Sequence, residues 1–146
     1  MYRYYLNIGT NLGDRKANLK HAIEALSEGA QRVEISEMIK SAPWGFTSPH
    51  EFLNVGVALY SPLSPQCMLS HLQGIERALG SENHRDSSGA YIDRLIDIDI
   101  MAIEDSKGQP LVISTPELTV PHPHLHDRPF FLTPYLELKG PDATNQ

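Results

Sequence analysis

The stretch FLNVGVALY at residues 52–60 decides how this chain folds, because it carries the clearest strand pattern in the sequence. Aliphatic side chains occupy every second position, as they do in a β-strand that turns one face toward a core. The other face begins with Phe52 and Asn54. We therefore expect an apolar core face and, on the opposite face, an aromatic ring beside an amide.

The segments on either side predict the partners of this strand. Alternation predicts strands at 2–8, weakly at 31–40, at 95–103 and at 111–113, and apolar spacing predicts helices around 19–29 and 64–80. This order of elements predicts a mixed sheet whose helices pack on one face, which leaves the other face for a ligand groove. The prolines between residues 116 and 134 predict that any helix in the tail is short.

Length and composition limit the function classes. The chain has 146 residues and a mass of 16.3 kDa, which fits one domain over residues 1–146. Its net charge of −6 disfavours binding to nucleic acid, because the phosphate backbone would repel it. A single cysteine, Cys67, excludes an intrachain disulfide. The sequence has neither a signal-peptide pattern nor a run of about 20 apolar residues, so we expect a cytoplasmic protein without membrane contact.

Asp97 and Asp99 are the sharpest chemical feature of the sequence. Two carboxylates two residues apart on a strand share one face, about 6–7 Å apart. The isoleucines between and beside them, Ile96, Ile98 and Ile100, predict that the opposite face is core. Two neighbouring acids on one sheet face fit a bound Mg²⁺ ion, and Arg94 just before them favours phosphoryl chemistry. A solvated polar face remains the alternative.

Two further groups of residues admit more than one interpretation. Phe52 and Asn54 suit a flat heteroaromatic ligand, which the ring would stack on and the amide would read, or Phe52 is an ordinary core residue. The histidines within 122–126 allow a zinc site, although a single histidine that contacts phosphate is the better interpretation. Neither a P-loop nor a dinucleotide fingerprint is present in the sequence.

In sequence order, these pieces resemble the 6-hydroxymethyl-7,8-dihydropterin pyrophosphokinase family of folate biosynthesis. The resemblance covers residues 4–138 and is most specific at 93–100 (DRLIDIDI), with further matching stretches at 9–15 (GTNLGDR), 52–55 (FLNV), 75–80 (IERALG), 118–122 (LTVPH) and 128–130 (RPF). It implies a ferredoxin-like α/β fold. It also implies an enzyme that transfers pyrophosphate from ATP to the pterin hydroxymethyl group and releases AMP.

The resemblance also implies roles for individual residues. Asp97 and Asp99 would bind two Mg²⁺ ions, and the phosphate chemistry would further involve Arg94. The residues expected around the pterin are Ser41, Ala42, Pro43, Trp44, Phe52, Asn54 and Phe130. Those expected around ATP are Gln73, Glu76, Arg94, Ile100, Thr119, His122 and Arg128. Only small-molecule substrates are expected as partners, with the enzyme acting as a monomer.

The chain departs from the family pattern in the loop that precedes the aspartates. Ser81 stands where the family usually has an arginine, and Arg85 is then the only arginine between Gly80 and Asp93. We expect Arg85 to supply the missing catalytic cation. The loops around Trp44 and at 81–93 are the candidate lids.

Two other function classes remain compatible with the sequence. A non-catalytic ferredoxin-like module would bind a nucleotide or a metal to regulate a partner, and the serine at position 81 favours it. A zinc hydrolase would use the histidines within 122–126. The module predicts binding without release of AMP, whereas the hydrolase predicts tightly held zinc.

Overall fold

The computed structural model describes residues 1–42, 50–80 and 96–140, which form three helices and seven strands. The helices are α1 (Arg15–Ser27), α2 (Pro65–Ala78) and α3 (Pro129–Lys139). The strands are β1 (Tyr2–Thr10), β2 (Arg32–Ile35), β3 (Ile39–Ser41), β4 (Phe52–Ser61), β5 (Asp97–Glu104), β6 (Ile113–Ser114) and β7 (Thr119–Val120).

The main sheet has the strand order β2-β4-β1-β5, and β3 pairs with the remaining length of β4. Together with the order β1-α1-β2-β3-β4-α2-β5 along the chain, this confirms the ferredoxin-like α+β arrangement. One detail differs, because every pairing in the described sheet is antiparallel, whereas a mixed sheet was expected. The weak strand expected at 31–40 is also two short strands, β2 and β3, which pair with successive parts of β4.

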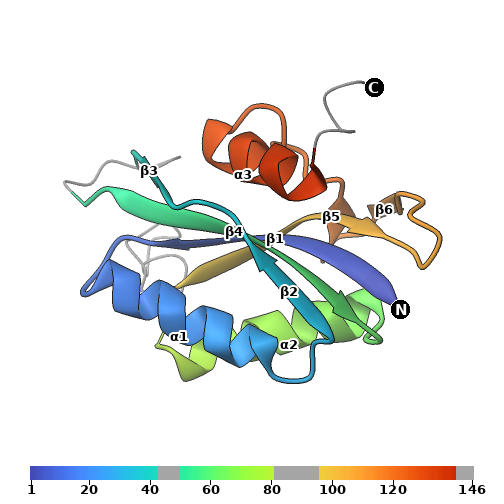
Figure 1. The fold of residues 1–146 in the computed structure, drawn as a ribbon, viewed down its shortest axis with the longest axis horizontal. Helices are drawn as coiled ribbons and strands as arrows, with labels where there is room; N and C mark the ends of the chain where they lie inside the picture. Colours follow the sequence, from blue (N-terminus) through green and yellow to red (C-terminus); the bar gives the residue numbers. More distant parts are fainter. Residues whose placement is uncertain (43–49, 81–95, 141–146) are drawn as a thin grey trace.

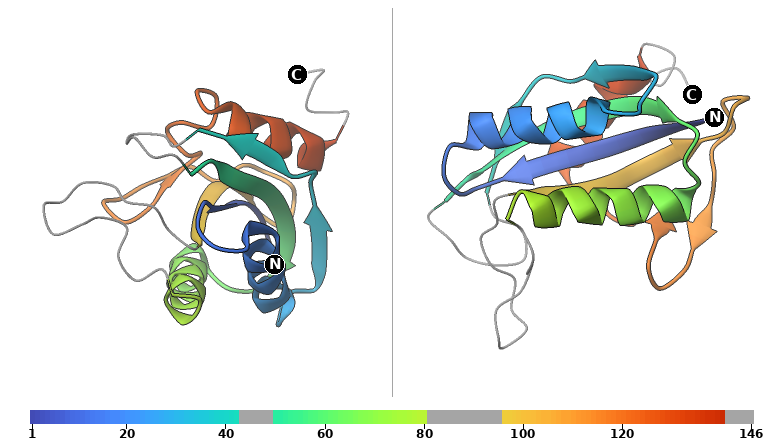
Figure 2. Two further views of the ribbon diagram at one scale, coloured as in Figure 1. Left: turned by 90° about the vertical axis from the view of Figure 1, so that its left-hand side faces the viewer. Right: turned by 90° about the horizontal axis from the view of Figure 1, so that it is seen from below.

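Helices α1 and α2 lie side by side under one face of the sheet (Figures 1 and 2). The alternating apolar residues of β4, which include Val55 and Val57, pack with Leu19 of α1 and Leu72 of α2 in the larger core. Helix α2 begins after Ser64 as expected, whereas α1 begins at Arg15, earlier than the expected 19–29; the side chains of Asp14 and Ser64 accept hydrogen bonds from N–H groups in the first turn. These two helices confirm the predicted core face.

The third helix corrects the expectation that all helices share one face. Helix α3 lies over the opposite face of the sheet (Figure 1). Gly56 allows this close approach, because a Cβ added at Gly56 would lie 2.6 Å from the Cβ of Pro134 and 3.0 Å from Cδ1 of Leu138. The second core cluster, which includes Tyr5, Met101 and Phe131, lies between α3 and the sheet. The groove therefore occupies only part of this face.

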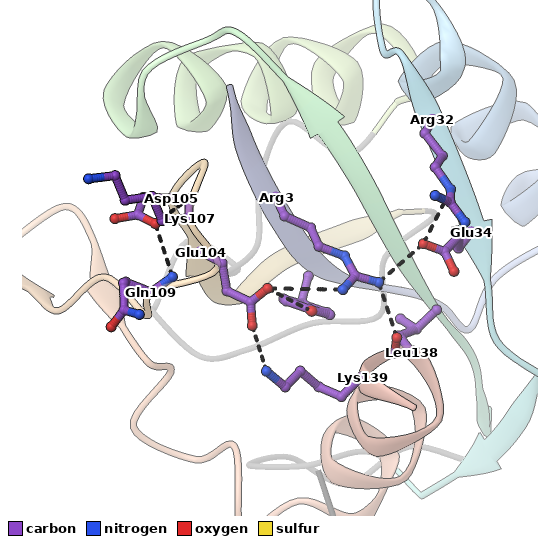
Figure 3. Close-up of polar contacts among 10 residues, drawn as sticks. Arg3, Arg32, Glu34, Glu104, Asp105, Lys107, Gln109, Leu138 and Lys139 are labelled. Carbon is purple, nitrogen blue, oxygen red and sulfur yellow. Dashed lines mark hydrogen bonds and ion pairs between the residues drawn. The ribbon is translucent and has the colours of Figure 1, made fainter. Parts of the chain in front are cut away.

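A partly buried polar network fixes the C-terminal end of α3 to the sheet (Figure 3). Lys139 donates to Glu104 at 2.6 Å, and the guanidinium of Arg3 donates to Glu34 at 3.1 Å and to the carbonyl of Leu138 at 3.2 Å. The hydroxyl of Tyr5 also donates to Glu104, at 3.1 Å. Because Glu104 is buried, these partners are needed to offset the cost of removing its charge from water.

In the described ranges, no helix is long and apolar enough to cross a membrane.

Candidate active site

Two rows of residues that run across β4, β1 and β5 form the floor of the site. Asn54 pairs with Gly9, and Gly9 pairs with Asp97; in the next row Gly56 pairs with Asn7, and Asn7 with Asp99. Residues that pair directly in an antiparallel sheet point to the same face. The amide of Asn54 and both carboxylates therefore lie on the face that α3 only partly covers, as the alternation predicted.

A cavity of about 680 Å³ opens above this floor. The sheet contributes its floor, α2 and α3 contribute walls, and the segment around β7 closes another side. The described residues that line it are Asn7, Gly9, Ser41, Ala42, Phe52, Asn54, Leu69, Leu72, Gln73, Glu76, Asp97, Ile98, Asp99, Pro116, Glu117, His122, Arg128, Phe130 and Phe131. One cavity thus contains residues predicted to contact the pterin and residues predicted to contact ATP and its metal ions.

Asn54 and Phe52 form the aromatic end of the cavity. Both N–H groups of the Asn54 amide are engaged with β3, because Nδ2 donates to Oγ of Ser41 at 2.8 Å and to the carbonyl of Ile39 at 3.3 Å. This orients Oδ1 as the atom that can accept from a ligand, while the Ser41 hydroxyl retains a proton to donate. A Cβ at Gly9 would lie 3.1 Å from Oδ1 of Asn54 and 3.3 Å from Cδ1 of Phe52, so Gly9 leaves room for both side chains.

Helix α2 holds the strand that carries the two aspartates. The carboxylate of Glu76, which is 5% exposed, accepts a hydrogen bond from the backbone N–H of Ile98 at 2.8 Å. Ile98 and Ile100 point into the core on the other side of the strand. Asp97 and Asp99 are each half-buried and face the cavity together. The two carboxylates are therefore held in fixed positions on one face of β5.

His122 is placed by an irregularity in β5. The register with β1 shifts at Met101, and the carbonyl of Met101 accepts the N–H of His122 at 2.9 Å. The N–H of His124 donates to Nδ1 of His122 at 3.0 Å, so a neutral ring carries its proton on Nε2. Burial, helped by the charges of Arg128 and His124, lowers the pKa of His122 to about 4 against a weaker opposing effect of Asp97. At neutral pH, His122 is an uncharged hydrogen-bond donor.

The charges around the cavity favour a bound cation. Its described lining carries four carboxylates, those of Glu76, Asp97, Asp99 and Glu117, against the single guanidinium of Arg128. Arg128 stacks over the ring of Phe131 at 4.9 Å. No group of three or more histidine, cysteine or acidic side chains able to hold a metal occurs in the described ranges. The donor set that the structure does offer is two strand carboxylates, which suits Mg²⁺ completed by water and phosphate oxygens.

The structure brings most of the predicted residues together. Ser41, Ala42, Phe52, Asn54 and Phe130 all line the cavity, as do Gln73, Glu76, His122 and Arg128. Two predicted ATP residues do not: the side chain of Ile100 is part of the core, and Thr119 lies exposed on β7 outside the lining. Pro43, Trp44, Arg85 and Arg94 lie outside the described residues.

Sequence reasoning missed Asn7 and Gly9, which lie on the floor of the cavity. The signal was available, because Asn7 is a polar residue on the same face of the first strand as Gly9. The zinc alternative gains no support from the described residues: Nδ1 of His122 accepts a backbone hydrogen bond, and Nδ1 of His124 lies 3.3 Å from Asp127. These imidazole nitrogens face protein groups instead of one another.

Comparison with known proteins agrees with this geometry. Residues 5–140 match the family model of 7,8-dihydro-6-hydroxymethylpterin-pyrophosphokinase. The chain is 45% identical over 131 residues to a 2-amino-4-hydroxy-6-hydroxymethyldihydropteridine pyrophosphokinase of Porphyromonas gingivalis, covering 89% of this chain and 86% of that protein. It is 37% identical over 139 residues to the protein of the same name from Aquifex aeolicus, covering 95% and 81% of the two chains.

Proposed function

The chain belongs to the 7,8-dihydro-6-hydroxymethylpterin-pyrophosphokinase family, and we propose that its cavity is where pyrophosphate passes from ATP to the hydroxymethyl group of 6-hydroxymethyl-7,8-dihydropterin, releasing AMP. One observation carries this assignment. The paired carboxylates of Asp97 and Asp99 share a cavity with the aromatic end formed by Phe52, Asn54 and Phe130. A phosphate-directed site and a site for a flat ring are thus adjacent.

Asp97 and Asp99 would hold Mg²⁺, and we propose two ions. The support is the donor chemistry, since carboxylate oxygens suit this hard cation, and the excess of negative charge among the described residues that line the cavity. When bound, the ions would neutralise the negative charge of the phosphates and help to activate the attacking hydroxyl. The role of the protein is to hold both carboxylates in place: the strand puts them on one face of β5, and Glu76 fixes the strand between them through the Ile98 amide.

The pterin ring would lie between Phe52 and Phe130. Two aromatic walls favour a planar heterocycle, and the acceptor Oδ1 of Asn54 together with the Ser41 hydroxyl supplies polar contacts for its edge. We assign the neighbouring Ala42, Pro43 and Trp44 to the same subsite. For Pro43 and Trp44 this assignment rests on the family resemblance.

The ATP phosphates would occupy the part of the cavity near Gln73, Glu76, His122 and Arg128. The Nε2–H of His122 donates to phosphate oxygen without adding a charge, while Arg128 supplies a cation. We retain Ile100 and Thr119 as ATP contacts, and because the Ile100 side chain is in the core, its contact would come from the backbone.

Catalysis would rest mainly on positioning. Attack of a primary hydroxyl on the β-phosphorus needs an in-line approach and stabilisation of the spreading negative charge. We propose that Arg94 and Arg85 supply that stabilisation together with Asp97 and Asp99 through their bound ions. For the two arginines, the support is the sequence pattern.

We propose further that residues 1–146 form one catalytic domain that acts as a monomer in the cytoplasm, without nucleic acid. The co-substrate ATP is an intracellular compound, and the net charge of −6 opposes contact with a phosphate backbone.

The direct test is an AMP-release assay with ATP, Mg²⁺ and 6-hydroxymethyl-7,8-dihydropterin. The proposed function predicts one AMP for each diphosphorylated pterin formed. A protein that binds both compounds and releases no AMP would instead be the non-catalytic module. ATP hydrolysis without pterin product would also contradict the proposal.

A further inference from the structure

A hydrogen bond to which the proposed function gives no role joins the floor of the cavity to one of its aromatic walls. Nδ2 of Asn7, on β1, donates to the backbone carbonyl of Phe130 at 2.7 Å, between residues 123 positions apart in the sequence. Asn7 is 2% exposed and lines the cavity. A buried amide on a sheet floor needs such a partner, but the partner here belongs to the residue that carries the proposed ring wall.

The carbonyl that Asn7 reaches lacks its usual helical donor. Phe130 lies four residues before Pro134, which stands inside α3 and has no N–H. In a regular helix, the residue at position 134 would donate to this carbonyl. Asn7 supplies the donor from the sheet instead, so the Phe130 carbonyl is bonded to β1 and not to its own helix.

Gly56 brings the helix within reach of Asn7. The two residues are direct partners across β4 and β1, and the Cβ of Pro134 fills the space where a Gly56 side chain would lie. The first turns of α3 therefore rest on the sheet at the row that contains Asn7. The next row, Asn54-Gly9-Asp97, forms the other part of the cavity floor.

The ring of Phe130 is not fixed by deep burial. Phe130 is only partly buried, and its ring packs edge-on against Phe131 with centroids 5.2 Å apart. Phe52, in contrast, is 5% exposed and belongs to the sheet itself. The position of the Phe130 backbone relative to the sheet therefore sets the spacing of the two rings.

We propose that Asn7 is a positioning residue for the pterin: it ties the Phe130 backbone to the sheet and so fixes the gap between Phe130 and Phe52. The inference rests on the proposed function, since it takes Phe130 as one wall of the pterin site. In this role, Asn7 acts through the Phe130 backbone and not through a contact of its own with the reacting atoms. Its effect should appear in pterin affinity and not in ATP affinity.

Calorimetry on the Asn7→Ala variant tests this selectivity. The variant lacks the donor, and we expect pterin, added after a non-hydrolysable ATP analogue, to bind about fivefold more weakly, as for the loss of one net hydrogen bond. The affinity for the analogue itself should stay at the wild-type value. Equal weakening of both ligands would overturn the proposal.

Arg3→Met is the matched control, because Arg3 lies on the same strand and anchors the opposite end of α3 through the Leu138 carbonyl (Figure 3). We expect this variant to lose thermal stability and to keep its pterin affinity. The same loss of pterin affinity in Arg3→Met as in Asn7→Ala would mean that any loosening of α3 suffices, which would overturn a specific role for Asn7.

A double variant separates positioning from simple hydrogen-bond satisfaction. Pro134→Ala, introduced into Asn7→Ala, returns a helical N–H to the Phe130 carbonyl but restores no link to the sheet. We expect thermal stability to recover in part and pterin affinity to stay low. Full recovery of pterin affinity would overturn the proposal, because a satisfied carbonyl would then be enough.

Hydrogen exchange in the ligand-free protein tests the anchor without any substrate. Asn7→Ala should accelerate exchange in the first turn of α3 relative to wild type. Unchanged exchange would overturn the anchor itself. Failure of the wild-type protein to release AMP would instead overturn the proposed function, so the two failures are distinguishable.

Discussion

The carboxylate of Glu76 accepts the backbone N–H of Ile98 at 2.8 Å, at the one residue that separates Asp97 from Asp99. Helix α2 thereby holds β5 at the centre of its acidic pair. Asp97 is the first residue of β5, and this end of the strand also pairs with β1 through Gly9. The contact connects the packing of a helix to the placement of the two carboxylates.

The stability of the protein should therefore depend on the acceptor oxygen of Glu76 more than on its charge. Glu76→Ala leaves the Ile98 amide unpaired, and we expect the free energy of unfolding to fall by about 1–3 kcal/mol together with a loss of AMP release. Glu76→Gln keeps an acceptor oxygen and should retain most of the stability. Thermal melts and the AMP assay compare the two, with Glu24→Ala, an exposed acid on α1, as control. Equal stability losses in the Ala and Gln variants would contradict this role.

Phe130→Leu should weaken pterin binding far more than ATP binding. The substitution keeps an apolar side chain but removes the aromatic face, and we expect about a tenfold rise in the pterin Kd. Tyr135→Leu is the control, because Tyr135 lies on the same helix and packs its ring on Tyr5 at 5.1 Å, outside the cavity lining. Calorimetry with an ATP analogue and then pterin separates the two ligands. Weakening by Tyr135→Leu to the same extent would show that Phe130 acts only through the stability of α3.

His122 should remain neutral across the physiological range. Its pKa is lowered to about 4, chiefly by burial, from the ordinary 6.5. The folded state then binds fewer protons than the unfolded state between these values, so His122 costs stability as the pH falls from 6.5 toward 4. Nitrogen-15 NMR of the metal-free protein should detect the Nε2–H tautomer at pH 7. In His122→Gln, the fall in melting temperature between pH 6.5 and 4 should be smaller than in wild type. An imidazolium signal assigned to His122 at about pH 6 would contradict the neutral state.

Arg85→Ala tests the catalytic role proposed for the only arginine in the sequence between Gly80 and Asp93. We expect kcat to fall at least about tenfold, or about 1.4 kcal/mol of barrier, with little change in pterin affinity. Arg77→Ala, an exposed arginine in the last turn of α2, is the control. Steady-state kinetics at saturating ATP measures both variants. If kcat for Arg85→Ala stays within about twofold of wild type, the remaining cations carry the phosphate charge without it.

The sequence predicted the parts of this structure that depend on local periodicity. Alternation along residues 52–60 and around Asp97 and Asp99 assigned each side chain to a face, and the pairing across Gly9 then placed both sets over one cavity. Capping residues such as Ser64 fixed where helices begin. These features follow from neighbours within a few residues, so a single sequence is enough to predict them.

The parts that depend on distant contacts were not predicted. The prolines of the tail predicted a short helix, but not that α3 would continue through Pro134. Nor did they predict that Asn7, far away in the sequence, bonds the carbonyl that this proline leaves without a helical donor. The register shift at Met101, which orients His122 through its carbonyl, likewise leaves no mark on the alternation. Helix α3 therefore covers more of the ligand face than the pattern of the tail indicated.

The most direct test of the central claim measures AMP release against Mg²⁺ concentration for wild type, Asp97→Asn and Asp99→Asn. Each variant removes one charge from the pair proposed to hold the ions, so we expect turnover to be abolished while the metal-free melting temperature stays equal or rises, because like charges no longer repel. Asp105→Asn changes a partly exposed acid just after the same strand and keeps the oxygen that accepts the Lys107 N–H, so it should behave as wild type. Near-normal AMP release by either site variant at ordinary Mg²⁺ would contradict the account.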